Sequence, residues 1–125
     1  MRGPGVELTI LSQDPELLAM EAAYDGSGQM PPEHWHPSQT ERFTILEGQM
    51  RAIIDGAGQI YEQGAVFDVP VGTVHQMAAE GGPARVRWEV RPALRTAEFF
   101  ERLYSGQVDE NFLDEFSAEI RFSGV

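Results

Sequence analysis

Apolar and polar residues alternate along much of the chain between residues 6 and 90, which is the pattern of β-strands with one buried face. In residues 17–24, for example, Leu18, Met20, Ala22 and Tyr24 share one face at a period of two. The pattern predicts about eight strands, at residues 6–11, 17–24, 42–46, 49–54, 59–62, 65–69, 74–79 and 84–90. Asp55-Gly56 has the sequence of a type I′ hairpin turn, in which both residues take positive φ. Short strands between regular turns indicate an all-β sandwich or barrel.

The period changes after Pro92, where helical spacing begins. We expect a helix over residues 97–104, with Thr96 as its N-cap and Gly106 as its stop. Its apolar stripe consists of Phe99, Phe100, Leu103 and Tyr104. A second amphipathic stretch, residues 109–116, is expected to bury Phe112, Leu113 and Phe116. The tail, residues 94–118, then forms a lid or buttress on the barrel, with a dimer contact as the alternative.

Composition narrows the classes of function. The 125 residues predict one domain with its core in residues 6–91. A net charge of −11 repels phosphate backbones and anionic membranes, so we expect neither nucleic acid nor membrane as a partner. All nine basic residues are arginine, which excludes a Schiff-base lysine, and the absence of cysteine excludes disulfides and thiolate chemistry. No secretory signal is recognisable, and a cytoplasmic location is the expectation.

The three histidines of the chain fall in two short segments. His34 and His36 are two residues apart, so on an extended strand both project to the same face. Glu41 follows after a short corner, and His75 comes from a later strand. Neutral imidazoles and a carboxylate are ligands that divalent transition metals select. The pattern therefore predicts a metal site.

These residues also stand in two longer motifs. The first runs Gly28, five residues, His34-Trp35-His36, four residues, Glu41, six residues and Gly48. The second runs Gly64, five residues, Pro70-Val71-Gly72, two residues and His75, with Ala79 where an asparagine would be expected. In both respects the sequence resembles the cupin superfamily, over about residues 17–91.

The resemblance implies a single cupin domain over residues 1–125: an all-β jelly-roll barrel with a short C-terminal helical segment. It implies that His34, His36, Glu41 and His75 bind one divalent transition metal, which could be Fe, Mn, Ni, Cu or Zn. It also implies a homodimer. Ala79 removes a polar group that the family places near the site, without removing a ligand.

Strand alternation suggests which side chains surround the metal. The candidates for substrate binding are Tyr24, Gln39, Phe43, Met77 and Trp88, for each of which core packing is the alternative. Glu41 is also the candidate catalytic base, because the chain has no fourth histidine and no lysine. The leading hypothesis is a dioxygenase-type oxidoreductase acting on a small organic molecule. The alternatives are a non-catalytic small-molecule-binding cupin and a metal-dependent isomerase or cyclase.

Overall fold

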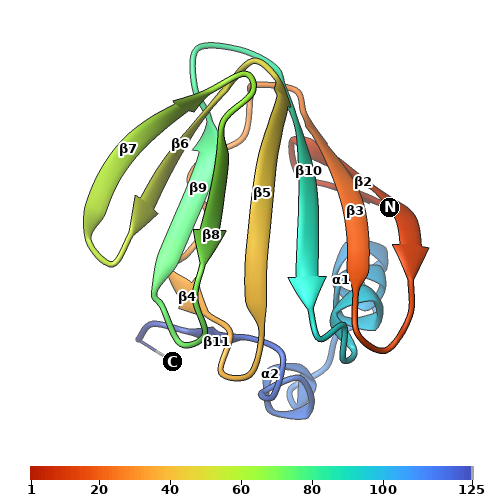
Figure 1. The fold of residues 1–125 in the computed structure, drawn as a ribbon. Helices are drawn as coiled ribbons and strands as arrows, with labels where there is room; N and C mark the ends of the chain where they lie inside the picture. Colours follow the sequence, from red (N-terminus) through yellow and green to blue (C-terminus); the bar gives the residue numbers. More distant parts are fainter. Residues whose placement is uncertain (125) are drawn as a thin grey trace.

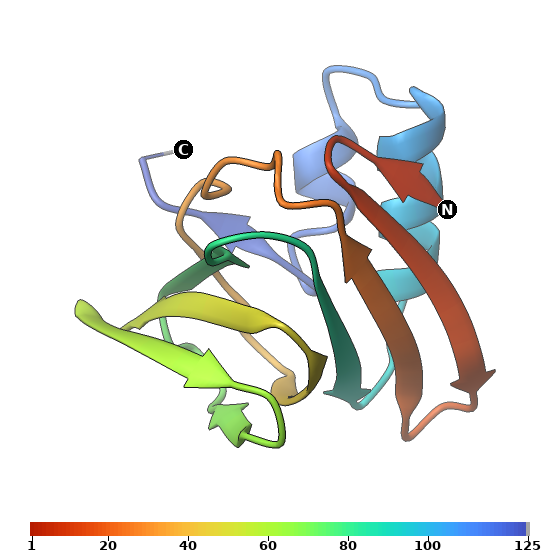
Figure 2. The ribbon, with the colours of Figure 1, turned by 90° about the horizontal axis from the view of Figure 1, so that it is seen from above.

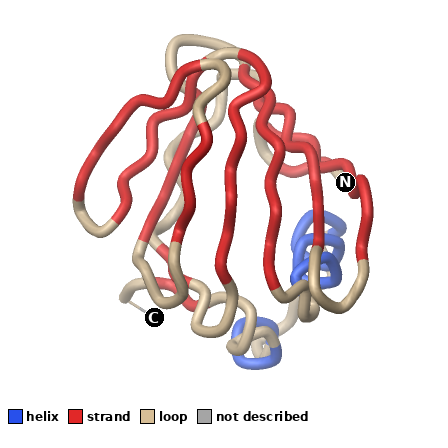
Figure 3. Tube along the Cα trace, viewed as in Figure 1, coloured by secondary structure: helices blue, strands red, loops and turns tan. Residues whose placement is uncertain are grey.

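The computed structural model describes residues 1–124, which form two antiparallel β-sheets and two short helices (Figure 1). The strands are β1 (Arg2–Gly3), β2 (Val6–Gln13), β3 (Leu18–Tyr24), β4 (His34–Trp35), β5 (Thr40–Glu47), β6 (Gln49–Ile54), β7 (Ala57–Glu62), β8 (Val66–Val69), β9 (His75–Ala79), β10 (Ala84–Arg91) and β11 (Arg121–Phe122). The helices are α1 (Thr96–Ser105) and α2 (Phe112–Glu115). Helix is confined to the C-terminal part of the chain (Figure 3). No helix among the described residues is long and apolar enough to span a membrane.

The larger sheet has the strand order β1-β2-β3-β10-β5-β8, and the smaller has the order β11-β4-β9-β6-β7. Consecutive strands thus often lie in different sheets, and the chain crosses between the two layers repeatedly. The helices and β11 gather on the side of the molecule away from the hairpin of β6 and β7 (Figure 2). The predicted fold class, an all-β jelly roll with C-terminal helices, is confirmed.

The core lies between the sheets and follows the period of two. In β10, for example, Ala84, Val86, Trp88 and Val90 are buried and the residues between them are not. Buried residues of both sheets belong to the same apolar cluster, including Phe43 from β5 and Met77 from β9. Alternation therefore places every second side chain of these strands inside, where any site between the sheets must lie.

Two turns explain how the strands are aligned. Asp55 and Gly56 have φ of 51° and 80°, which confirms the type I′ turn predicted between β6 and β7. Gly48 joins β5 to β6 at φ 75°, and a Cβ there would collide with the backbone of Pro83 and Ala84. Only glycine satisfies both conditions at this corner.

The C-terminal helices differ from the prediction in three respects. Thr96 does not cap α1 but is its first residue, and its hydroxyl accepts a hydrogen bond from the Gln39 amide instead. The second helix is shorter than predicted, because only Phe112–Glu115 are helical. Leu113, expected to be buried, is 39% exposed. The buried side chains here are Phe112 and Phe116, which directly follows the helix. Leu113 lies between them in the sequence but points to solvent.

Residues 107–124, which we call the C-terminal segment, are held beside the histidines by packing, ion pairs and strand pairing. Phe112, Phe116 and Ile120 form a second apolar cluster with Phe99 of α1. Arg95 and Arg102 cover this cluster, with guanidinium carbons over the Phe116 ring and ion pairs to Glu115. The segment ends in β11, whose two residues pair with the two residues of β4. The helical tail is therefore packed against the rest of the structure by apolar contacts, ion pairs and strand pairing.

Candidate metal centre

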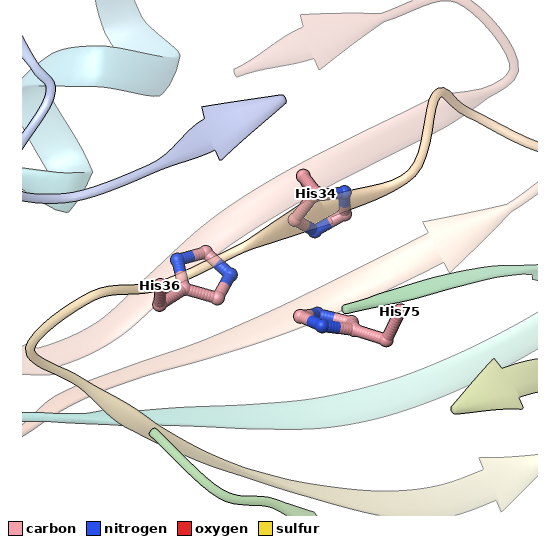
Figure 4. Close-up of side chains that lie close together, drawn as sticks. All are labelled: His34, His36 and His75. Carbon is pink, nitrogen blue, oxygen red and sulfur yellow. The ribbon is translucent and has the colours of Figure 1, made fainter. Parts of the chain in front are cut away.

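Two neighbouring strands of the smaller sheet bring the histidines together. His34 lies in β4, His36 follows directly after it, and His75 is the first residue of β9. His34 and His75 are opposite each other in the antiparallel ladder. The three side chains surround a common space (Figure 4), and one nitrogen of each lies within 4.8 Å of those of the other two. This group could hold a metal ion.

Backbone carbonyls orient all three rings. Nδ1 of His34 is 3.0 Å from the carbonyl oxygen of Pro32, and Nδ1 of His75 is 2.8 Å from that of Thr73. Nδ1 of His36 is 2.8 Å from the carbonyl oxygen of Glu119, in the C-terminal segment. Since a carbonyl only accepts, each Nδ1 carries the proton and donates it. In the neutral form of each ring, Nε2 therefore keeps its lone pair, which is the tautomer that a metal ligand requires.

Glu41 lies between the histidines and the core. Its Oε1 is 3.1 Å from Nε2 of His36 and 2.9 Å from Nε2 of His75. Its Oε2 accepts a hydrogen bond of 2.7 Å from the indole nitrogen of Trp88. Among the described residues, neither Glu41 Oε1 nor His36 Nε2 has a hydrogen-bond partner of good geometry, although both are buried.

The close contact between these two atoms has a simple explanation. Two atoms that both present lone pairs do not approach to about 3 Å in a dry interior unless a cation lies between them. A divalent ion with nitrogen and oxygen ligands would serve as this cation. The residues present therefore fit a metal of the kind predicted.

Replacing Trp88 with phenylalanine tests the support of the carboxylate. The substitution keeps an aromatic ring in the core but removes the only donor to Glu41 Oε2 found among the described residues. We expect zinc affinity to fall about 10- to 100-fold, as is usual when a partner of a metal ligand is lost. Competition with a chromophoric chelator measures this. Trp35→Phe, which changes the other tryptophan, is the control, and an equal affinity in both variants would contradict a supporting role for Trp88.

The protonation of the site follows from burial and charge. Burial, together with the nearby His75, lowers the pKa of His34 to about 4. Burial also opposes a charge on His36, but the adjacent Glu41 outweighs it and raises the pKa of that imidazole. For Glu41, burial is outweighed by the hydrogen bonds and charges of His36 and His75, so its pKa is lowered. Without metal, these shifts favour the anionic form of Glu41, the neutral form of His34 and the protonated form of His36.

Metal affinity should consequently depend on pH. Because the pKa of His36 is raised above 6.5, a proton competes with metal there already near neutral pH. Acidification therefore weakens metal binding, by about tenfold per pH unit where the metal must displace one proton. Zinc titrations between about pH 8 and about pH 5 measure the slope. An affinity that is constant across this range would contradict the assignment of His36 as a ligand.

A cavity of about 610 Å³ adjoins the site. His34, Glu41 and His75 form part of its wall, whereas His36 lies behind them and is 3% exposed. The remaining wall comes from the inner faces of both sheets, the loop at residues 26–32, helix α1 and the C-terminal segment. A ligand in this cavity would have direct access to the centre of the histidine group.

Four of the five residues predicted to bind substrate line this cavity: Tyr24, Phe43, Met77 and Trp88. Gln39 is the exception. Its side chain is buried at the corner before β5, and its amide nitrogen donates to the carbonyls of Pro92 and Ala93 and to the Thr96 hydroxyl. It fixes the start of α1 and does not reach the cavity.

Two parts of the cavity wall were not predicted from the sequence. Phe99, Phe100, Leu103 and Tyr104 of α1 line the cavity, as do Ile120 and Phe122 of the C-terminal segment. The apolar stripe of α1 was recognisable in the sequence, but its helical period does not indicate which part of the protein the stripe packs against. The carbonyl of Glu119, which orients His36, carries no sequence signature, because any residue supplies a carbonyl.

Solved structures similar to this chain share its fold. KdgF from a Halomonas species has a TM-score of 0.67 at 22% identity, covering 72% of this chain and 81% of its own. An RmlC-like cupin from Shewanella frigidimarina also has a TM-score of 0.67, at 23% identity, covering 74% and 80%. The Cnp3 cupin domain of Schizosaccharomyces pombe has a TM-score of 0.63 at 19% identity, covering 86% and 76%. No curated protein matches the sequence.

The sequence itself matches the family described as "Cupin domain" over residues 21–90, which is more than half of the chain and includes both histidine segments. Together with the two-sheet fold and the buried histidine group, this match establishes that the chain belongs to the cupin family.

Proposed function

We propose that this cupin is a metal-dependent enzyme of the dioxygenase type, with His34, His36, Glu41 and His75 as the metal ligands. The observation that carries the proposal is the pair of buried, facing lone-pair atoms, His36 Nε2 and Glu41 Oε1, at the wall of a cavity of about 610 Å³. A redox-active ion such as Fe, Mn, Ni or Cu would supply electron transfer between an organic molecule and dioxygen.

The residues of the chain have separate roles in this proposal. The histidines and Glu41 hold the ion, and Tyr24, Phe43, Met77 and Trp88 contact the substrate. Glu41 also accepts a proton from the substrate, because it is the only carboxylate among the described residues of the cavity wall. In the overall reaction the O–O bond and a carbon–carbon bond of the substrate break, and both oxygen atoms form new C–O bonds with the substrate. Dioxygen takes up the electrons that the substrate loses, so no external reductant is required.

The composition of the wall favours this reaction over an isomerisation. A metal-dependent isomerase needs an acid and a base at different positions on the substrate. Apart from Glu41, the described cavity wall holds no aspartate, glutamate, lysine or arginine, and both its histidines belong to the metal site. An apolar cavity also suits dioxygen and keeps water from oxidised intermediates.

Elemental analysis of untagged protein, purified without added metal or chelator, is the first test. About one equivalent of Fe, Mn, Ni or Cu per chain is expected, followed by oxygen uptake with catechol as the probe. Glu41→Gln should abolish the uptake, whereas Glu101→Gln, which changes an exposed carboxylate, should not. Turnover of cyclohexane-1,2-dione without oxygen would instead indicate the isomerase. Failure to take up any metal on reconstitution would leave only the binding function.

A homodimer, expected from the family resemblance, is part of the proposal. The edge of the larger sheet offers exposed apolar side chains on β2, with Ile10 at 36% and Leu11 at 49% exposure. A dimer would remove such surface from water. Sedimentation of the purified protein measures the oligomeric state directly, and a strict monomer would refute the dimer without affecting the metal site.

A further inference from the structure

We infer that the cavity binds an uncharged aromatic molecule, whose polar groups are met by the tyrosine hydroxyls and the metal site. The inference rests on the proposed function in one respect, since it takes this cavity to be the substrate site. It goes further by naming the class of ligand. Three features of the cavity wall support this class of ligand: its charge, its shape and its few polar groups.

No cationic side chain meets a ligand in this cavity. The wall contains none of the nine arginines, and the chain has no lysine. A buried carboxylate or phosphate without a cationic or hydrogen-bonding partner is strongly disfavoured. The net charge of −11 adds a field that repels anions before they arrive. Anionic substrates such as sugar phosphates therefore do not suit this site.

The metal centre could compensate only one negative charge. A divalent ion bound to three neutral histidines and the Glu41 carboxylate would retain a single net positive charge. One ionised oxygen of a ligand, placed on the metal, would neutralise it. Any further charge on the same ligand would lie in the apolar part of the cavity. The ligand is therefore uncharged except at the atom that meets the centre.

The rest of the wall is shaped by rings. Phe43 and Trp88 from the sheet are stacked at 5.8 Å between centroids, and Phe100 from α1 meets Trp88 edge-on at 5.3 Å. Ala79 belongs to the same wall, where the family motif would place a polar asparagine. Ring faces and edges at these distances favour flat aromatic ligands over sugars.

Two tyrosine hydroxyls supply further polar contacts. Tyr24 from β3 and Tyr104 from α1 both line the cavity, and Ser27 and Gln29 of the loop add polar side chains to its wall. Burial raises the pKa of both tyrosines, so they stay protonated and can donate. The ring of Tyr104 lies where a side chain on Gly3 would have to be, so the N-terminal strand holds it in place. A phenol or similar neutral group fits these two donors.

Calorimetry with a matched pair of probes tests this class. p-Cresol and 4-hydroxybenzoate have the same ring and hydroxyl, but the second carries a carboxylate at neutral pH. We expect p-cresol to bind at least about ten times more tightly to the protein after chelation, when no metal charge can compensate the carboxylate. Tyr24→Phe and Tyr104→Phe should each weaken p-cresol binding about 2- to 13-fold, the value of one neutral hydrogen bond.

A charge added at the cavity should reduce the preference for the uncharged probe. Leu103 and Leu113 are each 39% exposed in helices of the C-terminal part, but only Leu103 lines the cavity. Leu103→Arg should strengthen binding of 4-hydroxybenzoate at least about fivefold, whereas Leu113→Arg should not change it. Both positions tolerate a long polar side chain because they already reach solvent.

The outcomes separate this inference from the proposed function. Equal or tighter binding of 4-hydroxybenzoate by the unaltered protein after chelation, or no binding of p-cresol up to its solubility limit, would overturn the inference. A protein that prefers p-cresol but neither takes up metal nor consumes oxygen would overturn the proposed function alone. A protein that takes up metal but prefers 4-hydroxybenzoate would overturn this inference and leave the proposed function standing.

Discussion

Replacing His75 with alanine is expected to abolish stoichiometric metal binding while leaving the barrel folded. The loss should exceed the 10- to 100-fold that follows when only a partner of a ligand is removed, because a ligand itself is gone. His75 is 3% exposed, and its Nε2 is 2.9 Å from Glu41 Oε1. The variant therefore removes one member of the histidine group and one contact of the buried carboxylate. Elemental analysis and zinc titration measure the loss.

Two further variants make this result specific. His36→Ala should behave in the same way, although His36 does not line the cavity, because its Nε2 is 3.1 Å from the same carboxylate oxygen. Gln59→Ala, in the exposed strand β7, is the control and should keep full metal content. Far-ultraviolet circular dichroism should show unchanged strand content in all three. Full occupancy in both histidine variants would mean that the ligands have been wrongly assigned.

The parts of the fold that the sequence predicted are those governed by local rules. Long strands such as β3 and β10 have a buried face, so apolar residues recur along them at every second position. This pattern is recognisable in the sequence. The turn at Asp55-Gly56 was predictable because few residues tolerate its positive φ values. The spacing of His34 and His36 was informative for a related reason, since two residues separate neighbours on one face of a strand.

What could not be predicted depends on contacts between distant residues. β4 and β11 have two residues each, too few for any period, and they exist because they pair with each other. Gln39 was expected to meet a ligand because it is polar and close to Glu41 in sequence. It turns instead towards Pro92, Ala93 and Thr96, more than fifty residues away, which accept the hydrogen bonds of its amide nitrogen. Leu113 shows the same limit, because the period of so short a helix does not define its buried face.

Replacing Phe116 with alanine is expected to lower the free energy of unfolding by about 3–5 kcal/mol, the usual cost of emptying a buried phenylalanine site. Phe116 is fully buried, and its ring lies 5.1 Å from that of Phe112 and 5.5 Å from that of Phe99. The Arg95 guanidinium carbon lies 4.5 Å from its centroid. Leu113→Ala, at an exposed position of the same segment, is the control and should change stability by less than about 0.5 kcal/mol. Urea denaturation compares the two.

The same variant should also weaken metal binding, although Phe116 touches no ligand. Phe116 anchors the C-terminal segment, and three residues later the carbonyl of Glu119 accepts the Nδ1 proton of His36. If the segment detaches, His36 loses the contact that fixes its ring and tautomer, so zinc affinity should fall about 10- to 100-fold. Leu113→Ala should leave it unchanged. A destabilised Phe116→Ala protein with full affinity would mean that the segment supports the fold but does not orient His36. A parallel loss of both would make residues outside the matched family region part of the metal centre.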